Sequence, residues 1–182
     1  MGSLSAALVT FEHFLEFEDE DQGYRRELHD GEVVLVPPAR PAHVRLQWHL
    51  QRLLSQLVAE DAAVVAECPY KPHQNFQFWY ADVAVVLASD WNDKMRGDNW
   101  VSYSPALIAE ILSPSNRPSK INQQRIVAMS AGTLEFWVVD GDSRTVHVTT
   151  DSGVTIHVPG SFVPLQALSG RLVSVAEIFS TL

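Results

Sequence analysis

The stretch Ala106–Asp140, ALIAEILSPSNRPSKINQQRIVAMSAGTLEFWVVD, decides the fold that we expect for this chain. It begins with an apolar run suited to a strand that is covered on both faces. The segment SPSN at 113–116 ends this run, because proline cannot donate to a β-ladder and Ser and Asn bond to nearby backbone. Residues 118–131 then follow a helical pattern, and 134–139 form a second apolar run. A strand–helix–strand unit of this length predicts two parallel strands.

One carboxylate, Glu110, interrupts the first apolar run. Burying an unpaired carboxylate is costly, so such a group usually lies beside a cation or a metal, or else is protonated. One interpretation places Glu110 at a strand end, paired with Arg117 or another base. The other places it in a functional site. The same pattern recurs at 81–88, ADVAVVLA, where Asp82 opens an apolar strand.

The rest of the chain predicts a mixed α/β domain. Residues 42–60 carry leucines at helical spacing, and two strand-like runs flank the hairpin signal Asp30-Gly31. A second hairpin is expected around 151–153, a strand over 63–67 and a short closing helix near 174–182. The segment 90–104 is interpreted as a polar loop. Its aromatic residues are suited to stacking on bases or to packing under the loop.

Length and composition indicate one soluble domain spanning residues 1–182. No stretch approaches the about 18 apolar residues of a membrane span, and the N-terminus lacks the pattern of a secretory signal. Cys68 is the only cysteine, which excludes an intrachain disulfide and a multi-cysteine zinc site. A single cysteine fits a reducing cytoplasm, where we expect the protein to reside without a membrane partner.

The formal net charge of −9 argues against a simple nucleic-acid coat protein, but its distribution is uneven. Residues 1–32 hold nine acidic and two basic side chains, whereas no acidic residue lies between Glu110 and Glu135. Arg117, Lys120 and Arg125 give that interval a local charge of +3. Either a solvated helix face or a phosphate-binding surface explains these bases.

Asp82 and Glu110 are the candidate metal ligands. Two carboxylates that converge from neighbouring strand ends are able to hold a hard cation such as Mg²⁺, or Mn²⁺ in its place. A bound metal lowers the pKa of its water and neutralises charge on a phosphate, and a nearby lysine stabilises the transition state. We therefore expect the two carboxylates to lie within about 6 Å of each other at one end of the sheet, close enough for one cation to bridge them. An ordinary pair of ion-paired acids in a structural protein is the alternative.

Five segments follow one another in the order YRRELHDGEVV, PAHVRLQWHL, WYADVAVV, LIAEILSPSN and AGTLEFWVVD. This order resembles the Uma-two family, described as putative restriction endonucleases, within the PD-(D/E)xK nuclease superfamily. The resemblance runs from about Val9 to the C-terminus. It implies a central mixed sheet flanked by helices, a Mg²⁺-dependent phosphodiesterase site acting on DNA, and a homodimer.

Residue by residue, the resemblance places the motif aspartate on Asp82 and the motif glutamate on Glu110, with Glu27 as a further ligand or a supporting contact. The superfamily lysine would fall two residues after Glu110, where Leu112 stands. The resembled family moves its lysine onto the following helix, to the position of Gln124 here. Lys120, one turn earlier, is then the candidate for the missing charge.

The absence of a lysine at positions 112 and 124 leaves two functional hypotheses open. The first is a metal-dependent DNA endonuclease in which Asp82, Glu110, Lys120 and Gln124 carry the chemistry. The second is a nuclease fold with a decayed site that serves as a DNA-binding or protein-interaction module. His43 falls where the family often carries histidine, although capping or surface placement is the interpretation that we favour from the sequence.

Overall fold

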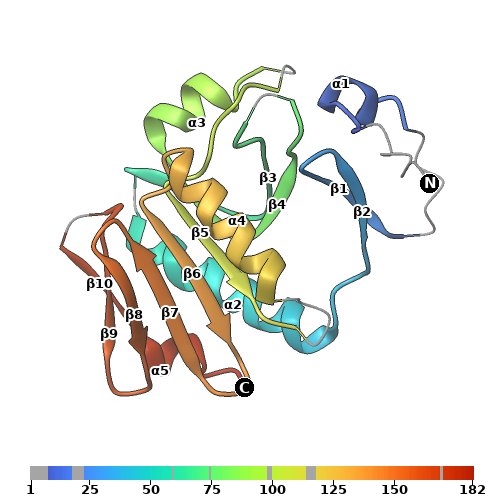
Figure 1. The fold of residues 1–182 in the computed structure, drawn as a ribbon. Helices are drawn as coiled ribbons and strands as arrows, with labels where there is room; N and C mark the ends of the chain where they lie inside the picture. The colour runs from blue at the N-terminus through green and yellow to red at the C-terminus, as the bar shows by residue number, and fades with distance from the viewer. Residues whose placement is uncertain are drawn as a thin grey trace.

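The computed structural model describes residues 8–17, 23–58, 60–73, 75–97, 100–113, 118–168 and 170–182 (Figure 1). Its centre is a six-stranded mixed sheet in the order β3-β4-β5-β6-β7-β8. The strands are β3 (Ala62–Tyr70), β4 (Trp79–Leu87), β5 (Leu107–Ile111), β6 (Glu135–Asp140), β7 (Thr145–Thr150) and β8 (Gly153–His157). This architecture confirms the predicted mixed sheet with flanking helices.

The central unit forms as the sequence predicts. All five residues of β5 are buried, and β5 runs parallel to β6 with Leu107 opposite Glu135 and Glu110 opposite Val138. The helix α4 (Pro118–Ser130) connects them. The other neighbouring strands of the sheet are antiparallel. Residues 114–117, which include Arg117, lie outside the described residues.

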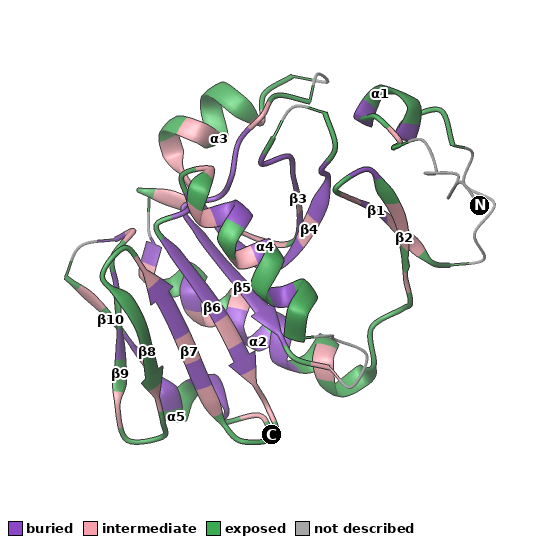
Figure 2. Ribbon diagram, in the orientation of Figure 1, coloured by how far each residue is buried: buried purple, intermediate pink, exposed green. Residues whose placement is uncertain are grey.

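The two faces of the sheet have different covers (Figures 1 and 2). On one face, α2 (Pro41–Val58) and α5 (Val175–Ile178) pack with the hairpin of β9 (Phe162–Leu165) and β10 (Arg171–Ser174) over an apolar core. Leu46, Leu50 and Leu54 give α2 a continuous apolar stripe toward this core, as their spacing predicts. On the other face, α4 packs on a second cluster that includes Ile108 and Phe136.

A separate hairpin, β1 (Arg25–His29) and β2 (Glu32–Val36), stands beside β4. Its turn has positive φ at Asp30 (49°) and Gly31 (82°), which explains the Asp-Gly signal. Two backbone hydrogen bonds of 2.9 Å join Leu28 to Phe78 of the segment that leads into β4. The short helix α1 (Phe11–Phe14) adds two aromatic rings to this contact. These contacts hold the hairpin beside the start of β4 in the main sheet.

Two expectations differ from the structure. The helix α3 (Ala88–Lys94) forms within the segment that we expected to be a polar loop, and the β9–β10 hairpin was not expected. Trp100 packs against Phe11 and Phe78, and Tyr103 is buried, so these two aromatics serve packing. Among the described residues, no helix combines the length and the apolar character needed to cross a bilayer.

Candidate active site

Asp82 lies just beyond the end of the hydrogen-bonded ladder between β4 and β5. The ladder between the two strands runs from Val83 opposite Ala109 to Val85 opposite Leu107 and does not continue to Asp82. The Asp82 side chain replaces the missing ladder bond, because its Oδ2 accepts a hydrogen bond from the backbone N–H of Ile111 at 2.7 Å. A carboxylate at the strand end is therefore fixed by the neighbouring strand.

Two side chains of α2 also hold Asp82 in place. His43 Nε2 lies 3.2 Å from Asp82 Oδ1, and Gln47 Nε2 donates to the Asp82 carbonyl at 2.8 Å. Our expectation that His43 caps a helix or lies on the surface is wrong, because its side chain is largely buried against this carboxylate. The first turns of α2 thus form one wall of the site.

Glu110 lies close enough to Asp82 for the charge of Asp82 to act on its pKa, and both line one cavity. Its neighbours Ala109 and Ile111 enter the core beneath α2, whereas Ile108, two residues away, packs on the α4 side. Glu110 is buried, and its Oε1 has no hydrogen-bond partner in the part of the chain that the structure describes. An orphaned carboxylate oxygen in a buried position requires a proton, a water or a cation.

The surroundings of Glu110 disfavour its ionised form. Burial raises the pKa of this carboxyl well above its usual range, and the negative charges of Asp82 and Glu27 raise it further. The guanidinium of Arg25 acts in the opposite direction on this pKa. A cation placed among these carboxylates would reverse the balance and restore the ionised form.

Glu27 approaches the site from the β1–β2 hairpin. Arg25 Nη2 donates to its Oε1 at 3.0 Å, and His29 Nε2 lies 2.8 Å from its Oε2. The side chain is buried, although β1 belongs to a sheet of only two strands. Both oxygens of Glu27 are therefore engaged by neighbours of its own strand.

Glu67 is a functional candidate that the sequence did not reveal to us. It is one of three non-glycine residues with positive φ (50°) among those described. In the β3–β4 ladder, Ala66 pairs with Val83 and Cys68 with Ala81, so Glu67 stands opposite Asp82 at a position where no pair forms. A left-handed backbone is strained for glutamate, and such strain concentrates at functional sites.

The Glu67 carboxylate links two other side chains of the site. It forms an ion pair with Arg25 and accepts a hydrogen bond from Gln47. Arg25 thus lies between Glu27 and Glu67, with its guanidinium 4.5 Å from the centre of the Tyr80 ring. The only sequence signal for Glu67 was a third acid at the end of an apolar run, AAVVAE.

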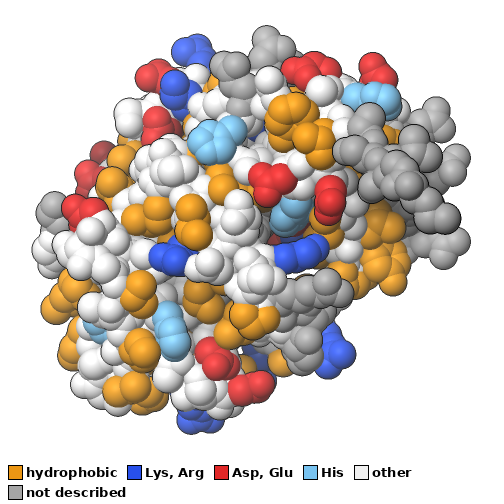
Figure 3. Space-filling model, viewed as in Figure 1, with side chains coloured by type: hydrophobic (Ala, Val, Ile, Leu, Met, Phe, Trp, Pro, Cys, Tyr) orange, Lys and Arg blue, Asp and Glu red, His pale blue; other side chains and the backbone are white. Residues whose placement is uncertain are grey.

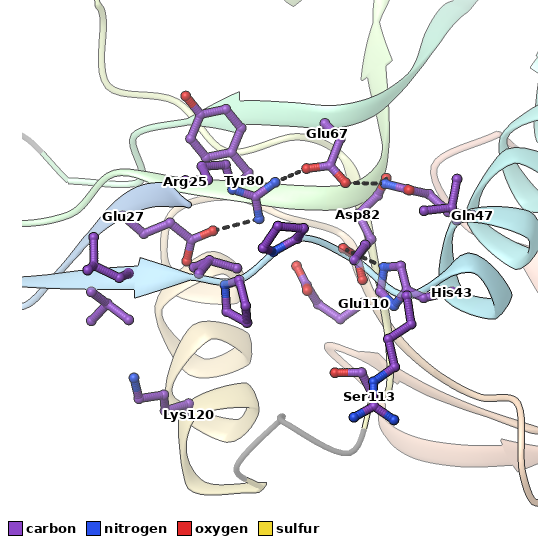
Figure 4. A pocket seen from close by; sticks show the side chains of 18 of the residues that line it. Arg25, Glu27, His43, Gln47, Glu67, Tyr80, Asp82, Glu110, Ser113 and Lys120 are labelled. Atoms are coloured by element: carbon purple, nitrogen blue, oxygen red, sulfur yellow. Dashed lines mark hydrogen bonds and ion pairs between the residues drawn. The ribbon is translucent and has the colours of Figure 1, made fainter. Parts of the chain in front are cut away.

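All four carboxylates line one cavity of about 690 Å³ (Figure 4). The β1–β2 hairpin and the proline segment that follows it form one wall, α2 a second, and α4 a third. From α4, Lys120 lies exposed at the rim, whereas Gln124 is buried. The structure therefore brings together Glu27, Asp82, Glu110, Lys120 and Gln124, the five residues predicted for the site.

The residues present fit a hard divalent cation. Carboxylate oxygens are its preferred ligands, and the orphaned Oε1 of Glu110 lies beside Asp82. Among the described residues, no three His, Cys, Asp or Glu side chains converge closely enough to hold a metal ion. Mg²⁺ is commonly held by one or two carboxylates with water and substrate phosphate completing its shell, and Asp82 and Glu110 would be the protein ligands of such a site.

A family model described as "Putative restriction endonuclease", Uma2, matches residues 11–176. The chain therefore belongs to the Uma2 family. The fold is similar to a crystal structure of a protein from Anabaena variabilis that is described as a putative nuclease, with a TM-score of 0.81 and 21% sequence identity. The match covers 94% of this chain and 98% of that one. A comparison with curated proteins found no match.

Proposed function

We propose that this protein is a metal-dependent endonuclease that hydrolyses phosphodiester bonds of DNA. The observation that carries the proposal is the buried Glu110 carboxylate, whose Oε1 lacks a partner among the described residues in a cavity shared with Asp82. Membership of a family described as restriction endonucleases and the similarity to a nuclease-like fold support the same conclusion. The homodimer and the choice of metal stay predictions.

Each residue has a role that follows from its position. Asp82 and Glu110 would hold Mg²⁺, which when bound polarises a phosphate and activates water. Arg25 keeps Glu27 and Glu67 from repelling the other two carboxylates, because it pairs with both. Lys120, at the rim, binds the incoming phosphate. Gln124 donates a hydrogen bond to the same phosphate or to the attacking water, without adding positive charge.

A second function is favoured by one observation. Gln124 occupies a buried position in the cavity wall, where the family resemblance places a lysine, and the nearest lysine on α4 is exposed. A site without a buried cation would bind DNA phosphate more weakly in the transition state. The alternative is therefore a decayed nuclease that retains binding to DNA or to a protein.

The test is cleavage of supercoiled, linear and single-stranded DNA with Mg²⁺, with Mn²⁺ and with EDTA. We expect metal-dependent cleavage that Asp82→Asn reduces by about 10²–10³-fold, since loss of one electrostatic group has this effect. Asparagine retains an oxygen for the Ile111 N–H, so the fold should survive. Asp151→Asn, in the exposed β7–β8 turn, is the matched control and should leave cleavage unchanged.

Binding measurements separate the two functions. Tight DNA binding without cleavage under any metal condition would favour the decayed-site alternative. Cleavage that persists at the wild-type rate in Asp82→Asn would contradict the assignment of the site.

A further inference from the structure

The α4 face of the sheet is only partly covered. Val146 and Val148 of β7 point into the core beneath α2, so the intervening His147 and the following Thr149 lie on the α4 face. Helix α4 contacts β6, and beside it Val154 and Ile156 of β8, which pair with Thr149 and His147, are exposed. Figure 3 views this face of the molecule, with hydrophobic side chains exposed over the β7–β8 region.

A second cavity, of about 330 Å³, lies on this surface beside α4. This volume falls at the lower end of the range for small-molecule sites, about 300–1,000 Å³. The cavity adjoins the acidic one, because Ser113 and Ile121 line both. Ser113 follows Glu110 by three residues, so the second cavity begins within one short segment of the candidate metal ligands.

The two cavities differ in their charged side chains. Four carboxylates and three basic side chains, Arg25, Arg40 and Lys120, line the first, whereas the residues that line the second include no acid and one arginine, Arg125. Arg125 donates through Nη2 to Asn122 Oδ1 at 2.7 Å, which orients its guanidinium on the cavity wall. Lys120 lines the first cavity from the same helix, five residues earlier and about 140° around the axis. The two cations therefore flank the ridge between the cavities.

The remaining lining is an apolar surface with a polar edge. Val138, Val154 and Ile121 provide the apolar part. Asn122, His147 and Thr149 provide groups that donate or accept hydrogen bonds. A flat ring system with a polar edge matches this combination, and a neighbouring phosphate matches the two cations.

We infer that the second cavity binds the base of a nucleotide next to the one whose phosphodiester lies in the acidic cavity. The inference rests on the proposed function and adds a substrate class to it. A base can enter this cavity only when it is unpaired, because a paired base is stacked within the duplex. The preferred substrate is therefore single-stranded or locally unpaired DNA, whose backbone crosses α4 between Lys120 and Arg125.

Val154→Glu and Ile156→Glu form a matched pair that tests the inference. Both residues belong to β8, are 58% and 61% exposed, and receive the same charge, but only Val154 lines the cavity. We expect Val154→Glu to raise the KM for a single-stranded oligonucleotide about tenfold with little change in kcat, since a carboxylate replaces an apolar contact to the base. Ile156→Glu should stay within about twofold of the wild type.

Two further measurements complete the test. In fluorescence anisotropy with Ca²⁺ in place of Mg²⁺, the wild type should bind a single strand of about 12 nucleotides more tightly than the same sequence as duplex, and Val154→Glu should lose this preference. Removing one base next to the cleaved position should weaken wild-type binding and leave Val154→Glu unaffected.

The outcomes separate this inference from the proposed function. A wild type that neither binds nor cuts DNA would overturn both. A wild type that cuts DNA while Val154→Glu and Ile156→Glu behave alike would overturn only the assignment of the second cavity. Equal affinity for single strand and duplex would also overturn it.

Discussion

Two buried glutamates, Glu110 and Glu135, lie on neighbouring parallel strands and have opposite surroundings. Glu135 is fully buried, and each of its oxygens has a donor: the backbone N–H of Ala167 at 2.8 Å and Trp137 Nε1 at 3.1 Å. Glu110 is also buried, but its Oε1 has no partner within the described chain. A buried acid is therefore structural where its oxygens are satisfied, and available for a ligand where one is not.

The two glutamates lie at opposite ends of the β5–β6 strand pair. Glu135 begins β6 and stands opposite Leu107, whereas Glu110 comes near the end of β5, opposite Val138. Burial raises the pKa of both carboxyls, but hydrogen bonds from Ala167 and Trp137 oppose the shift at Glu135, while nearby carboxylates increase it at Glu110. The carboxyl end of the pair opens into the cavity, as is common for ligand sites in α/β sheets.

The largest expected effect comes from giving Glu110 a nearby cation. Gln124→Lys places an ammonium in the cavity wall at little cost to the helix, because the two residues have similar helix propensities. We expect Mg²⁺-dependent cleavage to increase by about 10²-fold if Lys120 is a poor substitute. If Lys120 already supplies the charge, Lys120→Ala should abolish cleavage and Gln124→Lys should rescue it.

Steady-state cleavage kinetics measure this prediction. Gln123→Lys adds the same charge to an exposed position of α4 outside the cavity, and should leave the rate unchanged. Unchanged rates in both Gln124→Lys and Lys120→Ala would show that α4 does not supply the catalytic charge.

A smaller effect is expected when Glu135 loses its carboxylate. Glu135→Ala leaves the Trp137 Nε1–H and the Ala167 backbone N–H without an acceptor. Each unsatisfied buried donor lowers the free energy of unfolding by about 1–3 kcal/mol. The free energy of unfolding, measured with urea, should fall by about 3 kcal/mol. Stabilisation by Mg²⁺ should persist. Glu32→Ala, at an exposed position, is the control. A loss of Mg²⁺ response would mean that Glu135, too, belongs to the site.

The smallest expected effect is on the melting temperature of the metal-free protein as a function of pH. The pKa of Glu110 is higher in the folded than in the unfolded state, where it is about 4.3. The wild type therefore loses stability as the pH rises from that value through the folded pKa. Glu110→Gln does not titrate, so its melting temperature should exceed that of the wild type at pH 7–8, by about 2–4 °C for each kcal/mol.

The difference between Glu110→Gln and the wild type should disappear near pH 4, where both side chains are uncharged. Thermal melting in EDTA across this pH range measures it. A difference that does not vary with pH would mean that the folded protein does not shift the Glu110 pKa.

The sequence could predict the elements that depend on local pattern. The parallel pair β5–β6, the leucine stripe of α2 and the Asp-Gly hairpin all follow from periodicity and turn chemistry. The helix α3 was missed because its segment contains no buried residue, so no apolar period marks it. The β9–β10 hairpin has strands of four residues, which are too short for a clear alternation.

The sequence could also predict that Asp82 and Glu110 belong together, because each is a single acid in an apolar strand. It could not predict Glu67, since its role depends on a left-handed backbone opposite Asp82 and on an ion pair to another strand. His43 was misassigned for a similar reason. A helix of 18 residues such as α2 carries many exposed polar side chains. Only the packing of α2 on β4 turns His43 toward Asp82.

The four carboxylates come from four strands, β1, β3, β4 and β5, and the third wall of their cavity is α4. No local segment therefore contains all four carboxylates. During synthesis on the ribosome, the acidic cavity is incomplete until residue 124 has emerged and the β1–β2 hairpin has docked. A chain truncated before residue 124, or one in which the hairpin has not docked, lacks part of the lining, so the cavity is complete only in the folded protein.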